Sequence, residues 1–393
     1  MSWTLKVMLV AAEASADALG AGLARALKAK MGAQAVTFVG VGGAQMAAEG
    51  VASPFDIADL SLVGLFEIAG AVPRTLARLE ETVRLAEAEH PDVVVLIDSW
   101  GFMWRVARRL KLRAPGALRI KYVAPQVWAW GPGRARTVAK LFDRLMTLFA
   151  FEVPYFEAEG IAAACVGNPT LSRDFSRADP ARLRSAFGVA PDAPILLVLP
   201  GSRPGEIKRI LPVFEDAAIR LTNDRPDLQI VIPAAPTVAA AVKARVARWP
   251  FRAHLVEGEP DKLAAMRAAT LALACSGTVT TELAVAGCPM LVGYRGHPAT
   301  ALVVRMVLRT RFFTLLNLAA DQEIAPEFLQ ERCNGREIAA AAAALLDDPS
   351  RRQAQAEAQR AALTKLGLGV ADPFAAAADA VIDAARERGL IPA

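Results

Sequence analysis

The run Val93-Val94-Val95-Leu96-Ile97-Asp98 decides the fold of this chain, because five apolar residues follow one another without alternation and end on a carboxylate. Continuous runs of this kind are typical of parallel β-strands that are buried on both faces of a sheet. Helical patterns flank it at 61–89 and 104–111, and another apolar run follows at 120–123. This alternation of strands and helices predicts a doubly wound parallel α/β sheet.

The same pattern extends along the chain in both directions. Residues 5–12 and 36–41 predict strands, and 16–30 predict a helix between them. After Asn168 the sequence becomes polar and basic, which indicates a linker over 169–190. A second series of strands is then predicted at 195–199, 229–232, 271–274 and 290–293, with helices between and after them. The sequence therefore predicts two Rossmann-like domains that face a cleft, 1–168 and 191–366, and a C-terminal helix within 367–393 that returns to the first domain.

The composition raises the question of a membrane span. The 393 residues are 54% hydrophobic, and their mean hydropathy is +0.31. A spanning helix needs about 20 consecutive, mostly apolar residues. The longest stretch without a charge, 31–48, contains four glycines and reads as a strand with turns, so we expect no span. Glu13 and Asp17 interrupt the first apolar run before any cleavage-like region, so we expect no signal peptide either.

Cysteine and histidine positions indicate no metal site. The cysteines and histidines are widely spaced, without CxxC or HExxH patterns: Cys165, Cys275, Cys288, Cys333, His90, His254 and His297. Residues 40–43 do not complete a GxGxxG motif, because Gln45 occupies its last position, and NAD is disfavoured. We expect reduced thiols, no metal ion and no other cofactor.

Two predicted strand-to-helix turns indicate a site for phosphate groups. The stretch 199–208, LPGSRPGEIK, places a Gly/Ser turn, Arg203 and Lys208 at a helix start, where free backbone amides attract anions. Ser276-Gly277-Thr278 forms the second turn, and Glu282 follows where a carboxylate could hydrogen-bond a ribose diol. The alternatives are an ordinary turn with surface cations and a plain Ser/Thr helix cap. Together, the two turns favour a nucleotide diphosphate in the second half.

Carboxylates follow two predicted strands of the first half. Asp98 comes at the carboxyl end of its strand, where ligands of open α/β sheets bind, and this position suits a general base. The alternative is a helix cap or a salt bridge with nearby arginines. Glu13 and Asp17 follow the first strand in the same way, but Asp17 lies at a helix start, where a capping role is more common.

A basic and aromatic run lies between Asp98 and Asp143. It contains ten Lys or Arg residues, no acidic residue and four of the six tryptophans, which are Trp100, Trp104, Trp128 and Trp130. Upstream, the apolar stretch 60–72 is followed by basic residues. These features suit a membrane interface with anionic lipid head groups, and the basic surface also suits nucleic acid. The alternative is solvated helix faces around an ordinary core.

Together these segments resemble the lipid-A-disaccharide synthases, a family of glycosyltransferases with the GT-B architecture. The resemblance runs in order over nearly the whole chain, and YVAPQVWAW at 122–130 and LPGSR at 199–203 are its most specific parts. It also includes AEASAD at 12–17, GVGG at 40–43, LSLVGLFE at 60–67, PDVVVLID at 91–98, FE at 151–152, VGNP at 166–169, EI at 206–207, SGT at 276–278, VGYR at 292–295 and Asn317.

The resemblance implies an inverting transfer from UDP-2,3-diacylglucosamine to 2,3-diacylglucosamine 1-phosphate, which gives a β(1→6)-linked disaccharide 1-phosphate and UDP. It implies that Asp98 is the base for the acceptor 6-hydroxyl, that Arg203 stabilises the leaving diphosphate without a metal, and that Glu13 is a second polar contact. The donor-binding residues it implies are Gly201, Ser202, Ser276, Gly277, Thr278, Glu282, Tyr294, Arg295 and Asn317. The residues it implies for the acceptor or lipid are Ser15, Asp17, Val63, Leu65, Phe66, Trp128 and Trp130.

The resemblance assigns acceptor and membrane binding to the first predicted domain and UDP-sugar binding to the second. It implies a cytoplasmic enzyme that binds the surface of the inner membrane. The implied partners are the two lipid substrates and not nucleic acid, and a homodimer is compatible with the resemblance. The chain departs from the family pattern at Ala16, Leu19, 100–103 and 320–322, which affects contacts at the acceptor side and the nucleotide edge. Two alternatives are another GT-B enzyme, such as a UDP-N-acetylglucosamine 2-epimerase, and a non-catalytic binding protein for lipids or nucleotide sugars.

Overall fold

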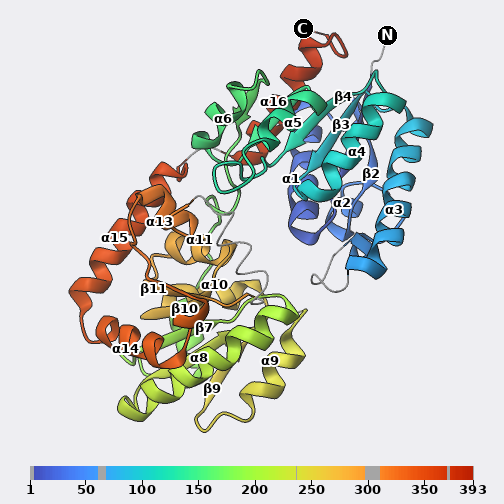
Figure 1. The fold of residues 1–393 in the computed structure, drawn as a ribbon. Coiled ribbons are helices and arrows are strands. Elements are labelled where there is room, and N and C mark those ends of the chain that lie inside the picture. The colour runs from blue at the N-terminus through green and yellow to red at the C-terminus, as the bar shows by residue number, and fades with distance from the viewer. Residues whose placement is uncertain (1–3, 61–67, 236, 297–309, 370–371, 393) are drawn as a thin grey trace. The chain divides into compact units, whose positions relative to one another are not determined.

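The computed structural model describes residues 4–60, 68–235, 237–296, 310–369 and 372–392 (Figure 1). Contacts divide the chain into two compact units, Met1–Pro169 with Val370–Ala393 (unit 1) and Thr170–Gly369 (unit 2). Each unit is a parallel six-stranded sheet covered by helices, as the continuous apolar runs predict. Within the described ranges, none of the helices has the length and apolar character needed to cross a membrane.

The sheet of unit 1 has the strand order β2-β1-β3-β4-β5-β6, and all neighbouring strands are parallel. Its elements are β1 (Leu5–Val10), α1 (Ala14–Met31), β2 (Val36–Val41), α2 (Ala44–Ala48), the 3₁₀ helix η1 (Ile57–Leu60), α3 (Ile68–Glu89), β3 (Val93–Ile97), α4 (Trp100–Arg113), β4 (Leu118–Tyr122), α5 (Arg134–Leu141), β5 (Arg144–Thr147), η2 (Ala150–Glu152), α6 (Val153–Glu157), β6 (Ala163–Cys165) and α16 (Pro373–Glu387).

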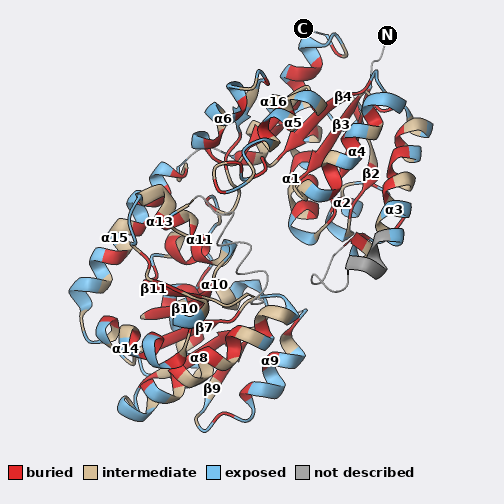
Figure 2. Cartoon of the chain, in the orientation of Figure 1, coloured by how far each residue is buried: buried red, intermediate tan, exposed pale blue. Residues whose placement is uncertain are grey.

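Helices cover both faces of this sheet, so its central strands have no exposed side (Figure 2). Leu5, Val7 and Leu9 of β1 point into a core that α1 and α16 share, whereas Met8 and Val10 point into a core with α3, α4 and α5. This arrangement explains why β1 and β3 lack the polar alternation of half-exposed strands. The C-terminal helix α16 thus packs against α1, although it lies more than 340 residues away in the sequence.

The sheet of unit 2 has the strand order β12-β11-β10-β7-β8-β9, again with parallel neighbours. Its elements are α7 (Pro180–Phe187), β7 (Ile195–Leu199), α8 (Pro204–Asp224), β8 (Gln229–Pro233), α9 (Ala239–Val246), β9 (Ala253–Val256), α10 (Glu259–Ala268), β10 (Leu271–Cys275), α11 (Thr278–Val285), β11 (Met290–Tyr294), α13 (Leu315–Ala320), β12 (Glu327–Leu329), η3 (Gln330–Arg332), α14 (Gly335–Leu346) and α15 (Pro349–Lys365). The predicted linker 169–190 contains α7, which packs against α10 within this unit.

The strand order of each sheet reverses at one place. In unit 1, β1 lies between β2 and β3, and in unit 2, β7 lies between β8 and β10. In each unit the chain thus builds the sheet outward from its first strand on both sides. In such sheets ligands bind beyond the carboxyl ends of the two strands at the reversal, which here are β1 and β3 in unit 1 and β7 and β10 in unit 2. All predicted catalytic residues follow one of these strands in the sequence.

Candidate active site

The two predicted phosphate turns of unit 2 begin beside each other. Strands β7 and β10 are parallel neighbours in which Leu199 pairs with Ala274, so the chain leaves both strands at the same level. The turn after β7 leads into α8, and the turn after β10 leads into α11. Both helix starts therefore lie at the point where the strand order of this sheet reverses, which is the usual ligand position in such sheets.

The turn after β10 offers unused backbone donors. The Ser276 N–H donates to the Gly293 carbonyl at 3.3 Å, whereas the N–H groups of Gly277 and Thr278 donate to no acceptor within the described part of the chain. Gly277 and Thr278 are exposed, and Thr278 opens α11. Exposed N–H groups at a helix start attract anions, so this turn can receive a phosphate group.

The turn after β7 already holds an anion of the chain itself. The Glu206 carboxylate accepts hydrogen bonds from the backbone N–H of Ser202 at 2.9 Å and of Arg203 at 3.2 Å. Gly201 has a φ of 111°, and a Cβ there would lie 2.4 Å from a Glu206 oxygen. The Arg203 side chain is 76% exposed and 3.4 Å from Glu206. In this turn the Ser202 and Arg203 amides are thus engaged, whereas the Arg203 guanidinium is largely exposed, and the donor contacts of Gly201, Ser202 and Arg203 stay predictions.

Glu282, the predicted ribose ligand, lies in a charged cluster. One carboxylate oxygen forms an ion pair with Arg173 and the other lies 2.7 Å from Lys262. Arg173 also lies 2.6 Å from Glu259. The Glu282 side chain is only 7% exposed, so a ribose hydroxyl would have to share this carboxylate with two cations. The sequence analysis did not identify Arg173 or Lys262 as part of this cluster.

Tyr294 ends β11, the strand next to β10, Arg295 follows it, and both residues are half-buried. The Tyr294 ring packs against Phe313 with 4.9 Å between centroids, and burial raises the pKa of its hydroxyl. Arg295 donates from Nε to the Gln330 carbonyl at 3.4 Å. Both residues therefore adjoin the Ser276 turn. Their side chains, however, already contact Phe313, shortly before α13, and Gln330, directly after β12.

Asn317, a predicted donor ligand, lies in a buried network of hydrogen bonds. The side chain is fully buried, and its amide donates to the Ala325 carbonyl and to Glu327 Oε1, both at 2.8 Å. Its oxygen accepts from the Ala325 N–H at 2.8 Å. Through these bonds Asn317 ties α13 to β12, and its contact with the donor stays a prediction.

Asp98 follows β3 at the reversal point of unit 1. It is half-buried, and its carboxylate has neither a hydrogen-bond donor nor an ion-pair partner among the residues that the structure describes. Its backbone is left-handed, with φ of 51° at Asp98 and 33° at Ser99. For residues other than glycine such conformations cost about 1–3 kcal/mol each, and they cluster at functional sites. The carboxylate is therefore held in an unusual backbone position while remaining available to a ligand.

The polar residues after β1 divide into two kinds. Glu13 is half-buried at the start of α1, and Ser15 is exposed there. Asp17, in contrast, is 4% exposed, and its carboxylate accepts from the backbone N–H of Gly43, Gln45 and Met46 at 2.7, 3.0 and 3.1 Å. Asp17 thus caps the start of α2, and its contact with an acceptor stays a prediction.

Trp128 and Trp130 lie beyond β4 in unit 1. Trp128 is half-buried and donates from its indole nitrogen to Glu152 at 3.2 Å, whereas Trp130 is 46% exposed with the Arg134 guanidinium 3.4 Å from its ring centroid. Burial raises the pKa of Glu152 to about 7. Val63, Leu65 and Phe66 lie outside the described residues.

The sequence model of the family described as lipid-A-disaccharide synthetase matches residues 7–380. This chain belongs to that family. The lipid-A-disaccharide synthase of Rhodospirillum centenum is 42% identical over 384 residues, which cover 98% of this chain and 96% of the relative. The relative from Paramagnetospirillum magneticum is 42% identical over 97% and 98% of the two chains. The chain is accordingly a glycosyltransferase of lipid A disaccharide synthesis, which uses a UDP-sugar donor and a lipid acceptor, and the epimerase alternative is not favoured.

Solved structures agree with the fold that this family assignment implies. A Staphylococcus aureus MnaA–UDP co-structure superposes with a TM-score of 0.63 at 16% identity and covers 99% of this chain and 98% of that one. The glycotransferase of kitacinnamycin gives a TM-score of 0.61 at 18% identity, over 97% and 99% of the two chains. Identities this low establish only the fold, which is the GT-B architecture with two Rossmann-like sheets.

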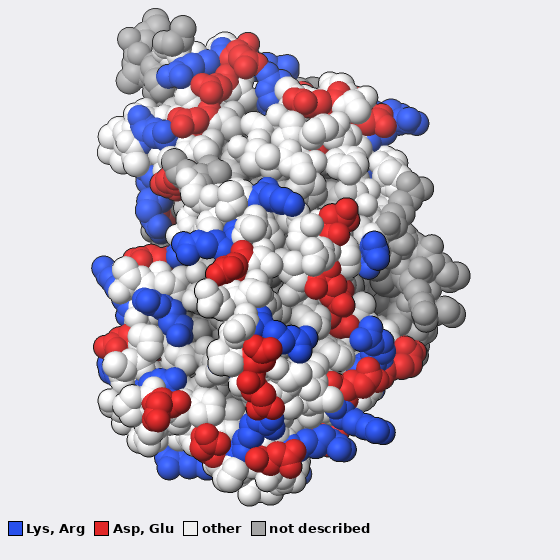
Figure 3. Space-filling view, turned by 90° about the vertical axis from the view of Figure 1, so that its left-hand side faces the viewer, with Lys and Arg blue, Asp and Glu red and all other residues white. Residues whose placement is uncertain are grey.

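Several arginines of the basic run between Asp98 and Asp143 form ion pairs with acidic residues, so the run has fewer unpaired cations than its sequence suggests. Arg113 pairs with Glu80 and Glu87, Arg119 pairs with Asp143, and Arg136 pairs with Glu159. On the face drawn in Figure 3, basic and acidic side chains are mixed, without one large area of a single sign. The face drawn there thus has no basic patch of the kind that nucleic-acid surfaces collect.

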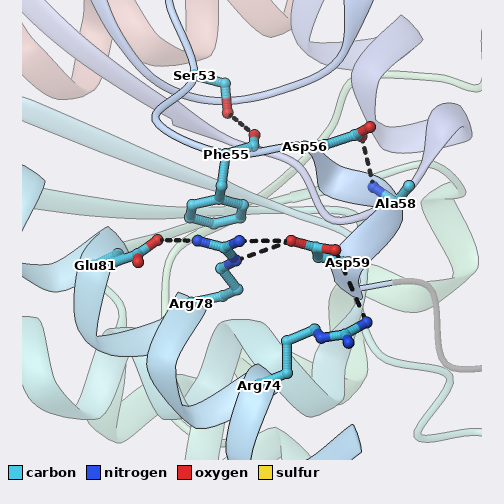
Figure 4. Close-up of polar contacts among 8 residues, drawn as sticks. All are labelled: Ser53, Phe55, Asp56, Ala58, Asp59, Arg74, Arg78 and Glu81. Atoms are coloured by element: carbon cyan, nitrogen blue, oxygen red, sulfur yellow. Dashed lines mark hydrogen bonds and ion pairs between the residues drawn. The ribbon is translucent and has the colours of Figure 1, made fainter.

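The family's apolar segment 60–67 is flanked by a cluster of polar contacts that joins η1 to α3 (Figure 4). The Arg78 guanidinium donates to Asp59 at 2.7 and 3.0 Å and to Glu81 at 2.7 Å, and it lies 4.8 Å from the Phe55 ring centroid. Arg74, 68% exposed, lies 4.0 Å from Asp59. Arg78 therefore connects the elements on either side of this segment.

Proposed function

We propose that this chain joins UDP-2,3-diacylglucosamine to 2,3-diacylglucosamine 1-phosphate and releases UDP, with Asp98 as the base. The observation that carries the proposal is the Asp98 carboxylate, which lies beyond β3 at the reversal point of the sheet and has no hydrogen bond or ion pair among the described residues. A base needs an unengaged carboxylate within reach of a substrate hydroxyl. The family assignment supplies the reaction class in which such a base acts.

In this reaction the acceptor 6-hydroxyl oxygen attacks C1 of the donor sugar while the bond from C1 to the diphosphate oxygen breaks. Asp98 takes the hydroxyl proton, the bond electrons leave with UDP, and attack from the opposite face inverts the anomeric centre. One base suffices for this displacement. The negative charge that grows on the diphosphate requires donors and cations at that end.

Binding of the UDP-sugar donor is assigned to unit 2. The free N–H groups of Gly277 and Thr278 support binding of the diphosphate, and the exposed Arg203 side chain supports charge stabilisation as UDP departs. Glu282 is assigned to the ribose, in competition with its ion pairs to Arg173 and Lys262. Glu13 and Ser15, which begin α1 beside β3, are assigned to the acceptor.

A UDP-release assay with the diacylated donor tests the proposal, with and without the monosaccharide 1-phosphate. We expect release that depends on the acceptor, and a loss of about 10²–10⁴ in kcat for Asp98→Asn, the usual contribution of a general base. Asp92→Asn is the matched control, because Asp92 precedes β3 and accepts from the backbone N–H of Lys6 at 2.8 Å. Full turnover by Asp98→Asn would remove the assignment of the base, and release without any disaccharide product would refute the transferase.

We also assign a membrane-facing surface to unit 1. Trp130, Phe151 and Tyr155 are 46%, 37% and 49% exposed, although large apolar side chains are usually buried. Phe151 packs against Trp128, and Tyr155 lines a surface hollow of about 330 Å³ with Val127. Aromatic side chains beside a cation such as Arg134 suit the head-group region of a bilayer.

Flotation with vesicles that contain anionic lipid tests this surface. Trp130→Ala should reduce the bound fraction, because it removes an exposed aromatic ring and the contact with Arg134. Leu112→Ala is the control, since Leu112 is 79% exposed on α4 and lies outside the aromatic group. Equal binding by the wild type and Trp130→Ala would exclude this surface as the membrane contact.

A further inference from the structure

Lys121 is a buried cation that the reaction described above does not use. It belongs to β4, is 1% exposed, and has only main-chain carbonyl groups as hydrogen-bond partners in the described chain. Its Nζ lies 2.7 Å from the main-chain carbonyl oxygen of Asp98, 3.0 Å from that of Tyr122 and 3.3 Å from that of Leu96. The ammonium group of Lys121 thus contacts main-chain carbonyls at the carboxyl ends of both β3 and β4.

The number of acceptors matches an ammonium group. A charged lysine has three N–H donors and no acceptor, and each of the three carbonyls can receive one. Burial lowers the pKa of Lys121 to about 7, while the negative charge of Asp98 opposes this decrease. A buried cation that forms no ion pair at contact distance is unfavourable for folding, so its position calls for an explanation other than stability.

The contacts of Lys121 fall on the strained part of the site. Asp98 and Ser99 have left-handed φ angles, and Val123, just beyond β4, has a φ of 71°, which is exceptional for a β-branched residue. The Asp98 N–H donates to the Tyr122 carbonyl at 2.8 Å, and the Asp98 carbonyl accepts from Lys121. Both polar backbone groups of Asp98 are therefore fixed by two consecutive residues of β4.

We propose that Lys121 is a positioning residue, whose ammonium group holds the left-handed backbone of Asp98 so that the Asp98 carboxylate stays aimed at the acceptor hydroxyl. This inference rests on the proposed role of Asp98. Without the contact, the Asp98 carbonyl loses its donor, and the backbone can relax toward an ordinary conformation. A displacement of about 1 Å at a reacting group can cost about 10² in rate.

Lys121→Met and a control variant, Arg119→Met, test the proposal. Arg119 lies two residues earlier on β4, is 8% exposed, and donates to the Leu141 and Ala117 carbonyls and to Asp143, at 3.0, 3.2 and 3.2 Å. Both variants remove a buried cation from the same strand, but only Lys121 contacts Asp98. We expect Lys121→Met to lower kcat about 100-fold with the KM for the UDP-sugar donor unchanged, and Arg119→Met to keep kcat within about threefold.

A rescue experiment separates positioning from general stabilisation. Glycine adopts left-handed φ angles freely, so Ser99→Gly should lower the cost of the strained turn and restore part of the kcat that Lys121→Met loses. Where Lys121→Met does not fold, Lys121→Arg replaces it, because the planar guanidinium keeps the charge but cannot reproduce three convergent contacts. Folded Lys121→Arg should show the same loss of kcat.

The outcomes distinguish this proposal from the one on which it rests. Wild-type kcat in folded Lys121→Met or Lys121→Arg, combined with a large loss in Asp98→Asn, overturns the positioning role and leaves the base intact. Equal losses of kcat in Lys121→Met and Arg119→Met, without rescue by Ser99→Gly, also overturn it, because they indicate a stability effect. Full activity of Asp98→Asn removes the base assignment itself.

Discussion

Glu152 gives unit 1 a pH-dependent stability that can be calculated from its position. Its side chain is only 3% exposed and accepts hydrogen bonds from Trp128 Nε1 at 3.2 Å and from the Phe149 N–H at 3.3 Å. Burial raises its pKa from the ordinary 4.5 to about 7, because the charged form loses its hydration, and the two hydrogen bonds offset only part of this effect. Replacement by glutamine removes the titration and keeps the shape of the side chain.

The sign of the effect follows from proton binding. A carboxyl group whose pKa is raised on folding binds its proton more tightly in the folded state, so the stability that this provides is present below pH 4.5 and is lost as the pH rises to 7. At about 1.4 kcal/mol per pKa unit, the loss amounts to about 3 kcal/mol. Burial of the side chain justifies using the full value, because solvent does not screen it.

Urea unfolding between pH 4.5 and 7.5 measures this loss, with tryptophan fluorescence as the probe because five of the six tryptophans belong to unit 1. Across this range the free energy of unfolding of Glu152→Gln should rise by about 3 kcal/mol relative to that of the wild type. Glu157→Gln, an exposed change on α6, should keep a constant difference. A constant difference for Glu152→Gln as well would refute the reasoning, since it would mean that Glu152 titrates equally in both states.

Two further changes test the geometry of unit 2. Gly201→Ala places a methyl group 2.4 Å from a Glu206 oxygen at a left-handed φ, so it should lower the free energy of unfolding by about 1–3 kcal/mol and raise the donor KM. Gly188→Ala is the control, because Gly188 also has a left-handed φ, 66°, but open space around the added carbon, and it should leave the donor KM unchanged. Equal donor KM values in the wild type, Gly201→Ala and Gly188→Ala would contradict the prediction. Arg173→Gln removes one of the two cations that pair with the buried Glu282 and should lower the unfolding free energy, measured in urea, by about 1–3 kcal/mol. An unchanged midpoint and slope would show that Lys262 alone satisfies that carboxylate.

The fold could be predicted where strands are continuous and apolar, as at β3, β7 and β10. Burial on both faces leaves a direct trace in such strands, because every side chain must be apolar. Strand β4 carries two buried cations, Arg119 and Lys121, so its sequence LRIKY resembles a half-exposed strand and only 120–123 was predicted. The short edge strands β6 and β12 have three residues each and leave no periodic signal.

The site could be predicted as a set of positions but not as a set of roles. Motifs locate Asp17 and Asn317 near strand or helix ends, yet both are buried and bonded to main-chain groups that lie 26 and 8 residues away in sequence. Partners at such distances depend on tertiary packing, which one sequence does not reveal. Lys121 had a readable signal, a cation within a predicted strand, whereas Arg173 lies in a stretch that predicts only a linker.

Hydrogen bonding separates the residues that stabilise the fold from those available to substrates. Asp17, Glu206 and Asn317 have their polar atoms engaged, and removing Asp17 or Asn317 would leave buried backbone groups without partners. Asp98 and Arg203 differ, because the Asp98 carboxylate has no partner in the described chain and Arg203 has one long contact while most of its side chain is exposed. A carboxylate that forms no hydrogen bond and lies on a strained backbone does not stabilise the folded state, so selection for stability does not explain it. A substrate that supplies the missing partner does, which is why these two residues carry the catalytic assignment.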